Sequence, residues 1–464
     1  MAGAGGKPRR AAIQASSEWK RLMSRAGLLA RQDGGGQPGA WADPHPTRIP
    51  VGQTAQVKIA APTIRWTPWR FVTAFGVVSL LSDVVYEGAR SVIGPYLATL
   101  GASATLVGLV TGVGEAFALA GRLGTGPLAD RTRAYWPLVL VGYVLTMVAV
   151  PALGLTSALW LASVLFVAER AGKAIRGPAR DVMISHAASA VGRGKGFAVH
   201  EALDQAGAVA GPLLVAAVLA ATAYHYRPAF LALAVPAVAA LLLLLWLRAG
   251  VPDPRRFEPG PQPGASPAPP GVRLPRVFWT YLAFTVLTTA GYATFGVLSF
   301  HLATRQVVPV AVVPVVYAAA MGVDAIAALA SGWLYDRAGL RVLAAVPVLT
   351  ALIPLAAFTT TPATAVAGVL AWGAVLGIQE SAMRAAIADI VPTGRRGTAY
   401  GIFAAGLGAA TLVGGVLIGA LYDYSITAMI ITVAGIQAVA LALFVATDRP
   451  ATRPVRPSPR GSRG

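Results

Sequence analysis

Long apolar segments follow one another along most of this chain. Windows of about 20 apolar residues, the length that crosses a bilayer, lie near 69–99, 104–128, 136–155, 158–180, 197–222 and 228–248. They recur near 277–300, 308–335, 340–360, 363–390, 398–421 and 425–446. The pattern predicts an all-α polytopic membrane protein with twelve transmembrane helices in two six-helix bundles, residues 66–248 and 277–447.

The segments outside these bundles have a different composition. Residues 1–65 are rich in Gly, Pro, Arg and Lys and lack the apolar centre of a secretory signal, which indicates a disordered basic cytoplasmic tail. Within that tail, 18–32 could instead form an amphipathic helix on an anionic membrane surface. Residues 249–276 are expected to be a cytoplasmic Pro/Gly-rich linker and 448–464 a basic tail.

Composition narrows the class of protein further. Only 12% of the 464 residues are charged, against about 25% in soluble domains. The chain has no cysteine, so no thiolate nucleophile or cysteine-based zinc site is expected. The net charge of +19 is concentrated in tails and loops, which favours membrane orientation over nucleic-acid binding. The sequence has no phosphate-binding loop, nucleophile–base arrangement or metal-ligand cluster, so we expect neither an enzyme nor a bound cofactor or metal.

The basic loop residues lie mainly on one side of the predicted spans. That side has pairs of basic residues, two of them at Arg131/Arg133 and Arg395/Arg396, together with both tails and the linker. The other side has only Arg227 and Arg305. The positive-inside rule therefore predicts a plasma-membrane protein with both termini in the cytoplasm.

A short sequence motif occurs at equivalent places in the two halves. GPLADRTR (126–133) follows the second span, GWLYDRAGLR (332–341) follows the eighth, and both read Gly-x-x-x-Asp-Arg. A hydropathy repeat of six plus six is typical of transporters. With these motifs, the chain from about 66 to 447 resembles the major facilitator superfamily, including its bacterial proton-coupled exporters. The second copy continues the family signature through Gly339 and Arg341, whereas the first has Arg133 at the place of the second glycine.

The residue types of the motif suggest a physical role for each position. Glycine lets helices approach closely, an aspartate can face a helix N-terminus, and the arginines can pair with acids such as Asp181 and Asp389. By resemblance, these contacts close the cytoplasmic gate in the outward-facing state, and generic loop ion pairs are the alternative. The predicted gate residues are Gly126, Asp130, Arg131, Asp181, Gly332, Asp336, Arg337, Arg341 and Asp389.

In the fifth span, GAVAGP (207–212) resembles the core of the family's antiporter signature. Gly207 and Gly211 have the spacing that packs helices, and Pro212 can bend one. The likeness favours export, while packing alone is an equally good explanation.

Ionisable residues within the spans are costly and usually functional. By resemblance, spans 1, 4, 7 and 10 line a central cavity with 2, 5, 8 and 11 alongside, and the charges follow that division. In SDVVYEGAR (82–90), within the first span, Asp83, Glu87 and Arg90 share one helical face. The predicted cavity residues are Asp83, Glu87, Arg90, Glu115, Glu169, Arg170, Lys173, His200, Glu201, Asp204, Asp324, Glu380 and Arg384.

Several of these residues could instead neutralise one another. Glu169 with Lys173 and Glu380 with Arg384 have the i,i+4 spacing of helical ion pairs, so structural pairing and substrate contact both stay open. Arg170 has about the depth of the family's proton-coupling arginine, although Ala174 replaces the glycine expected after it.

Acids outnumber bases in the first half, and crowded carboxylates favour protonation of at least one. As the residue that binds the coupled proton we favour Glu115, Glu201 or Asp204, followed by Asp83 and Glu87. The mixed charges leave both a cationic or zwitterionic solute and an organic anion possible.

The sequence therefore predicts a monomeric secondary transporter that exports a small organic solute across the bilayer by alternating access, coupled to protons. The alternatives are a transporter-like sensor or receptor that binds a ligand without net flux, and an uncoupled uniporter.

Overall fold

The computed structural model describes residues 66–257, 274–392 and 395–447. The predicted tails at 1–65 and 448–464 and most of the predicted linker lie outside these ranges. Every regular element within them is a helix.

The helices of the first half connect antiparallel neighbours through short turns. They are α2 (Pro68–Arg90), α3 (Ile93–Thr99), α4 (Ala104–Ala120), α5 (Arg122–Thr132), α6 (Tyr135–Leu153), α7 (Leu159–Val191), α8 (Arg193–Ala221), α9 (Tyr226–Ala232) and α10 (Ala234–Gly250), followed by the short helix η1 (Pro254–Phe257).

The second half repeats this succession. Its helices are α11 (Arg276–Ala290), α12 (Phe295–Thr304), η2 (Val310–Val312), α13 (Val313–Ala338), η3 (Gly339–Ala344), α14 (Ala345–Ala357), α15 (Pro362–Glu380), α16 (Ala382–Ile390), α17 (Arg396–Tyr424) and α18 (Ile426–Thr447).

The predicted twelve spans are confirmed. Ten helical segments of the described chain are long and apolar enough to cross a membrane, with α13 and α14 counted together. Taken as separate spans, α13 and α14 bring the number to eleven. The twelfth span is α7, which is less apolar than the others because it contains several charged residues. The successive spans place both Gly-x-x-x-Asp-Arg motifs at one end of the bundle, here called the motif end. The α3–α4 and α17–α18 connections lie at the opposite end.

Several spans are interrupted rather than continuous. The first breaks at Ser91 and Val92 between α2 and α3, and the seventh at residues 291–294 between α11 and α12. Span 10 breaks at Ser381, between α15 and α16. In transporters such interruptions expose backbone and side chains to the binding site.

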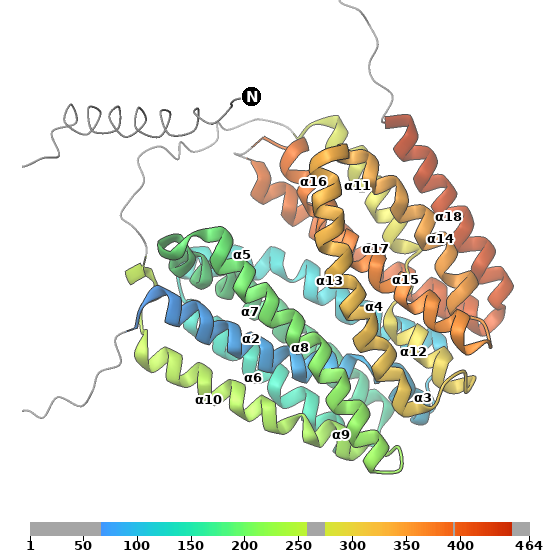
Figure 1. Cartoon of the computed structure of the whole chain (residues 1–464), viewed down its shortest axis with the longest axis horizontal. Coiled ribbons are helices and arrows are strands. Elements are labelled where there is room, and N and C mark those ends of the chain that lie inside the picture. The colour runs from blue at the N-terminus through green and yellow to red at the C-terminus, as the bar shows by residue number, and fades with distance from the viewer. Residues whose placement is uncertain (1–65, 258–273, 393–394, 448–464) are drawn as a thin grey trace, which may run out of the picture. The chain divides into compact units, whose positions relative to one another are not determined.

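The most extensive contacts between the two halves are made by two helix pairs. Figure 1 shows α4 beside α17 and α8 beside α13, and both pairs are in contact. The α4–α17 crossing depends on glycine, because a Cβ on Gly108 would lie 2.0 Å from the carbonyl oxygen of Gly415. The same device operates within the first half, where a Cβ on Gly211 of α8 would lie 2.4 Å from the Val84 carbonyl oxygen of α2.

Burial is reversed relative to a soluble protein. Large apolar side chains are exposed on the outer helices, among them Val148 on α6, Val235 on α10 and Ile431 on α18. Charged side chains such as Asp83, Glu169 and Arg170 are buried. The exposed apolar faces suit lipid, which leaves the charges to the interior.

Candidate functional site

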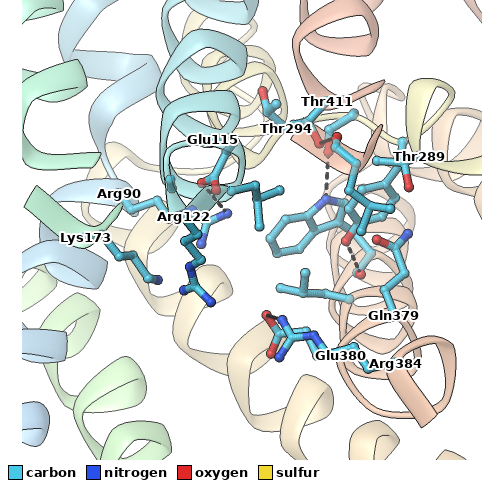
Figure 2. Close-up of a pocket in the computed structure, with 17 residues that line it drawn as sticks. Arg90, Glu115, Arg122, Lys173, Thr289, Thr294, Gln379, Glu380, Arg384 and Thr411 are labelled. Atoms are coloured by element: carbon cyan, nitrogen blue, oxygen red, sulfur yellow. Dashed lines mark hydrogen bonds and ion pairs between the residues drawn. The ribbon is translucent and has the colours of Figure 1, made fainter. Parts of the chain in front are cut away.

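A cavity of about 160 Å³ lies between the two halves (Figure 2). Seventeen residues line it, drawn from both halves: Arg90, Glu115, Ala118, Leu119, Arg122, Lys173, Thr289, Tyr292, Ala293, Thr294, Trp372, Leu376, Gln379, Glu380, Arg384, Leu407 and Thr411. The interruptions in spans 7 and 10 supply several of them, as expected for a carrier site.

An alternating network of charges lies in and behind the first-half wall of the cavity. Glu115 lies between two arginines, 3.0 Å from Arg90 and 3.5 Å from Arg170. Arg90 also lies 3.4 Å from Glu87, and Arg170 lies 3.0 Å from Glu169. Each arginine is thereby shared between two carboxylates. Glu169 pairs with its neighbour Arg170, so the i,i+4 pairing with Lys173 that its spacing suggested is not the one formed within the described chain.

Two further cations of the cavity, Lys173 and Arg122, have no ion pair with any residue that the structure describes. No described carboxylate lies within 4.0 Å of Lys173 or Arg122 in an ion pair, and the buried Nε of Arg122 has no hydrogen-bond partner. The Nζ of Lys173 lies 4.6 Å from the centre of the Tyr86 ring, a cation–π distance. These two side chains therefore contribute positive charge that the described protein does not neutralise by direct contact.

The second-half wall is built from stacked aromatic and polar groups. Trp372 stacks on Tyr292 with ring centres 5.7 Å apart, and its Nε1 donates to the Ala293 carbonyl at 2.8 Å. The Tyr292 hydroxyl donates to the Trp372 carbonyl at 2.7 Å. These bonds fix the broken part of span 7 against α15. At the rim, Glu380 and Arg384 lie 3.9 Å apart with their side chains about half exposed.

A second group of predicted residues lies outside the cavity lining. Asp204 is 3.6 Å from His200 Nε2 and 3.9 Å from Arg180. Asp83 is buried, with no ion pair to any described residue. Glu201, on the same helix as Asp204, is exposed. The predicted cavity set is therefore divided, and only Arg90, Glu115, Lys173, Glu380 and Arg384 line the cavity.

Contacts across the halves tie this interior together. Asp324 on α13 is 2% exposed and accepts a hydrogen bond from Gln205 of α8 at 3.3 Å. The Tyr317 hydroxyl of α13 donates to Glu87 of α2. Both bonds must break or change if the two halves move apart.

The cavity continues toward the motif end. A hollow of about 690 Å³ shares Arg122 and Arg384 with the cavity and is also lined by Gly126, Asp130 and Asp181. The cavity and the hollow therefore adjoin on the side of the motif end.

The ion pairs suggested for the gate are absent from the described residues. Asp181 pairs with Arg180 at 3.0 Å, and Asp389 accepts a hydrogen bond from the Tyr335 hydroxyl at 2.8 Å. Arg337 lies 3.4 Å over the Trp333 ring. Arg131 and Asp336 are exposed, as is Arg341, while Gly332 faces Ser381. The lack of ion pairs between these gate residues agrees with the hollow at the motif end.

The opposite end is held together. Asp423 of α17 accepts hydrogen bonds from the N-terminus of α4, from Ala104 N at 3.1 Å and Thr105 N at 2.8 Å, and from the Thr105 hydroxyl at 2.6 Å. Deeper in, Thr111 and Thr294 share a hydrogen bond of 2.8 Å across the halves. His301 is 1% exposed, and its Nδ1 lies 3.0 Å from the Tyr422 hydroxyl.

Sequence reasoning missed several residues of this interior. Trp372, Tyr317 and Gln205 are uncharged, so a search for ionisable groups within apolar spans passes over them. Asp423 was missed because it lies at the end of a span, where an acid carries no signal. Its proximity to the α4 N-terminus arises from contacts more than 300 positions apart in the chain.

Two six-helix halves around a charged internal cavity define a polytopic membrane carrier. A profile of the Major Facilitator Superfamily matches residues 75–378 and 309–464, and the chain belongs to that family of membrane transporters.

Comparisons with single proteins agree with the family. An uncharacterised protein of Mycobacterium tuberculosis is 54% identical over 404 residues, which cover 87% of this chain and 99% of the relative. An uncharacterised MFS-type transporter of Methanocaldococcus jannaschii is 29% identical over 178 residues, 38% of this chain and 44% of the relative.

Solved structures share the fold at low sequence identity. The nucleoside transporter NupG superposes with a TM-score of 0.66 at 12% identity, covering 82% of this chain and all of NupG. A bacterial homologue of the lysosomal transporter Spinster, in an inward-facing and occupied conformation, has a TM-score of 0.64 at 15% identity, with 82% and 97% covered. These likenesses establish the fold of the carrier.

Proposed function

We propose that this protein is a proton-coupled secondary transporter of the plasma membrane that exports a small organic solute by alternating access. The observation that supports it best is the cavity between the halves, which continues toward the motif end while α4 and α17 pack at the opposite end. A carrier needs a site reached from one side at a time.

We take the motif end to be cytoplasmic. The basic residues of the loops gather there, as the positive-inside rule requires of a cytoplasmic face. The arrangement is then inward-facing. Closing the motif end would bring Arg131 and Arg337 toward acids of neighbouring helix ends, with Asp181 and Asp389 as partners, while the Asp423 contact opens on the other side.

The proton site is proposed among the carboxylates of the first half. Glu115 holds Arg90 and Arg170, so its protonation would release two cations into the cavity wall. Asp204 lies beside His200 and Arg180, in a second group that a proton could reorganise. Either carboxylate could link proton binding to the arrangement of the halves.

The proposed export direction is supported by the antiporter-like sequence GAVAGP (207–212) of α8. Gly207 and Gly211 pack α8 on α2, since a Cβ at either would meet backbone oxygen at 2.4 Å. Pro212 follows within the helix. This rigid contact would let α2 and α8 move as one body during the rocking of the halves.

The test is reconstitution of the purified protein into liposomes with an imposed pH gradient. A solute panel is screened for uptake, and an internal pH dye records proton movement. At least one solute should move protons, and Glu115→Gln or Asp204→Asn should abolish that movement. The matched control is Asp253→Asn, the same carboxylate-to-amide change on an exposed residue after α10 that pairs with Arg255.

Each alternative has its own outcome in this assay. A sensor would bind a solute without flux, and a uniporter would carry it at a rate independent of the pH gradient. Coupling that survives neutralisation of Glu115, Glu201 and Asp204 one at a time would refute the assigned proton site. Flux in right-side-out against inverted vesicles measures the direction.

A further inference from the structure

We propose that the solute is an organic anion with an apolar body, with its negative group held by Lys173 and Arg122. This inference rests on the proposed transport function and names its substrate class. It starts from the charges that line the cavity, which are Arg90, Arg122, Lys173 and Arg384 against Glu115 and Glu380. The lining therefore carries two more positive than negative groups.

Pairing identifies which positive groups are available. Arg90 is held by Glu87 and Glu115, and Arg384 lies 3.9 Å from Glu380. Lys173 and Arg122 have no such partner among the described residues. Most acids of the first half therefore do not line the cavity. Glu87 and Glu169 pair with Arg90 and Arg170 behind its wall, and Asp83 also lies outside the lining.

Lys173 and Arg122 are both half-buried, which makes this charge pattern informative. A cation removed from water is costly unless an opposite charge or strong hydrogen bonds compensate it. The buried Nε of Arg122 has no partner in the described chain, and Lys173 has only the Tyr86 ring and the surrounding field. A carboxylate or phosphate between these two side chains would supply the missing negative charge and acceptors.

The remaining wall fits an apolar body. Figure 2 shows Arg90, Arg122 and Lys173 on one side of the cavity and the Thr289, Thr294, Thr411 and Gln379 side chains on the other. The apolar residues Ala118, Leu119, Leu376, Leu407 and Trp372 also line the cavity. An anion with its charge toward α5 and α7 can place an apolar part against these groups, with the threonine and glutamine side chains available to polar substituents.

The experiment measures binding to the purified full-length protein in nanodiscs. Its probes are matched triplets of carboxylate, amide and primary amine: hydrocinnamate, its amide and the corresponding amine, and the same set built on octanoate. A carboxylate should bind at least tenfold more tightly than its amide and amine. A phosphonate analogue added to each set distinguishes a carboxylate from a phosphate headgroup.

Variants connect the preference to the two side chains. Lys173→Gln and Arg122→Gln should each weaken carboxylate binding about tenfold and leave amide binding unchanged, since a hydrogen bond to a charged group is worth about a factor of ten or more. Lys173→Arg should restore most of it. Lys195→Gln and Arg248→Gln, exposed residues outside the cavity lining, are the matched controls. Unchanged binding of the amide also shows that each variant is folded.

Failure of this inference differs from failure of the transport function. If an amine or amide binds best, or no carboxylate or phosphonate binds at millimolar concentration, the anion assignment is overturned even where another solute drives flux in liposomes. If carboxylates bind as expected but no solute crosses the bilayer, the anion site stands and the transport function falls.

Discussion

Asp423 is expected to control how often the end opposite the motifs opens. Its carboxylate belongs to α17 of the second half and caps α4 of the first, through two backbone N–H groups and the Thr105 hydroxyl. Opening that end separates α4 from α17 and transfers the carboxylate to water. Asp423→Ala removes the contact in the closed state alone, so it should raise the population of the open state.

The size of the effect follows from helix capping. Replacing a capping acid with alanine costs about 0.5–2 kcal/mol. Asp423 is exposed, so water competes for its carboxylate, and we take a value of about 1 kcal/mol. This corresponds to roughly a fivefold rise in the ratio of open to closed molecules.

Cysteine labelling can measure that ratio, because the natural chain has no cysteine. Ser299 on α12 is 0% exposed and faces Gly94 of α3 across the halves. A Ser299→Cys probe should react with an impermeant maleimide added at the opposite end only when that end opens. Its labelling rate should rise about fivefold with Asp423→Ala.

Two controls define what would refute this reasoning. Asp423→Asn keeps a capping oxygen and should raise the rate less than alanine does. Asp253→Ala, on a loop beyond α10, should leave it unchanged. A labelling rate that Asp423→Ala does not raise would show that the cap does not stabilise the closed end.

Further expectations concern the charge network and the helix crossing. Carboxylate binding by the native protein should depend on pH, and Glu115→Gln should remove most of that dependence, because Glu115 is the carboxylate that pairs with both Arg90 and Arg170. Binding titrations of both proteins at acid and alkaline pH check this. Gly415→Ala should destabilise the protein by about 1–3 kcal/mol, because the new Cβ meets the backbone of α4. Thermal unfolding measures this loss, and Gly435→Ala is the control because there is open space around its Cβ.

The Glu115 experiment also bears on direction. If protonation raises the affinity for the solute, proton and solute favour each other on the carrier, which is the linkage of a symporter. The inward proton gradient would then drive uptake. Tighter binding at alkaline pH is the linkage of an antiporter and supports the proposed export.

The sequence was sufficient for the architecture. Twelve apolar windows, the repeated Gly-x-x-x-Asp-Arg motif and the location of charges away from the outer spans all follow from local composition. The i,i+3 and i,i+4 pairs were equally predictable where helix geometry alone decides them, as for Glu87 with Arg90 and Glu380 with Arg384. In these cases the partners lie three or four residues apart within one span.

The division of the charges between cavity and interior could not be predicted in that way. Glu115 takes its partners from α2 and α7, and Asp324 from α8. Such contacts depend on how the helices rotate and cross, which hydropathy does not encode. For the same reason the acid surplus counted along the chain gave no guide to the positive lining of the cavity.

The charges of α7 have a consequence for how the protein enters the membrane during synthesis. Glu169, Arg170, Lys173 and Arg176 lie on this single helix, and each would disfavour its partition into lipid alone by about 2.5–3.5 kcal/mol on translocon scales. Their partners Glu115 and Tyr86 belong to earlier helices and are already made when α7 leaves the ribosome. Integration of α7 should therefore require α2 and α4, and a ribosome-bound chain lacking them should leave it outside the bilayer.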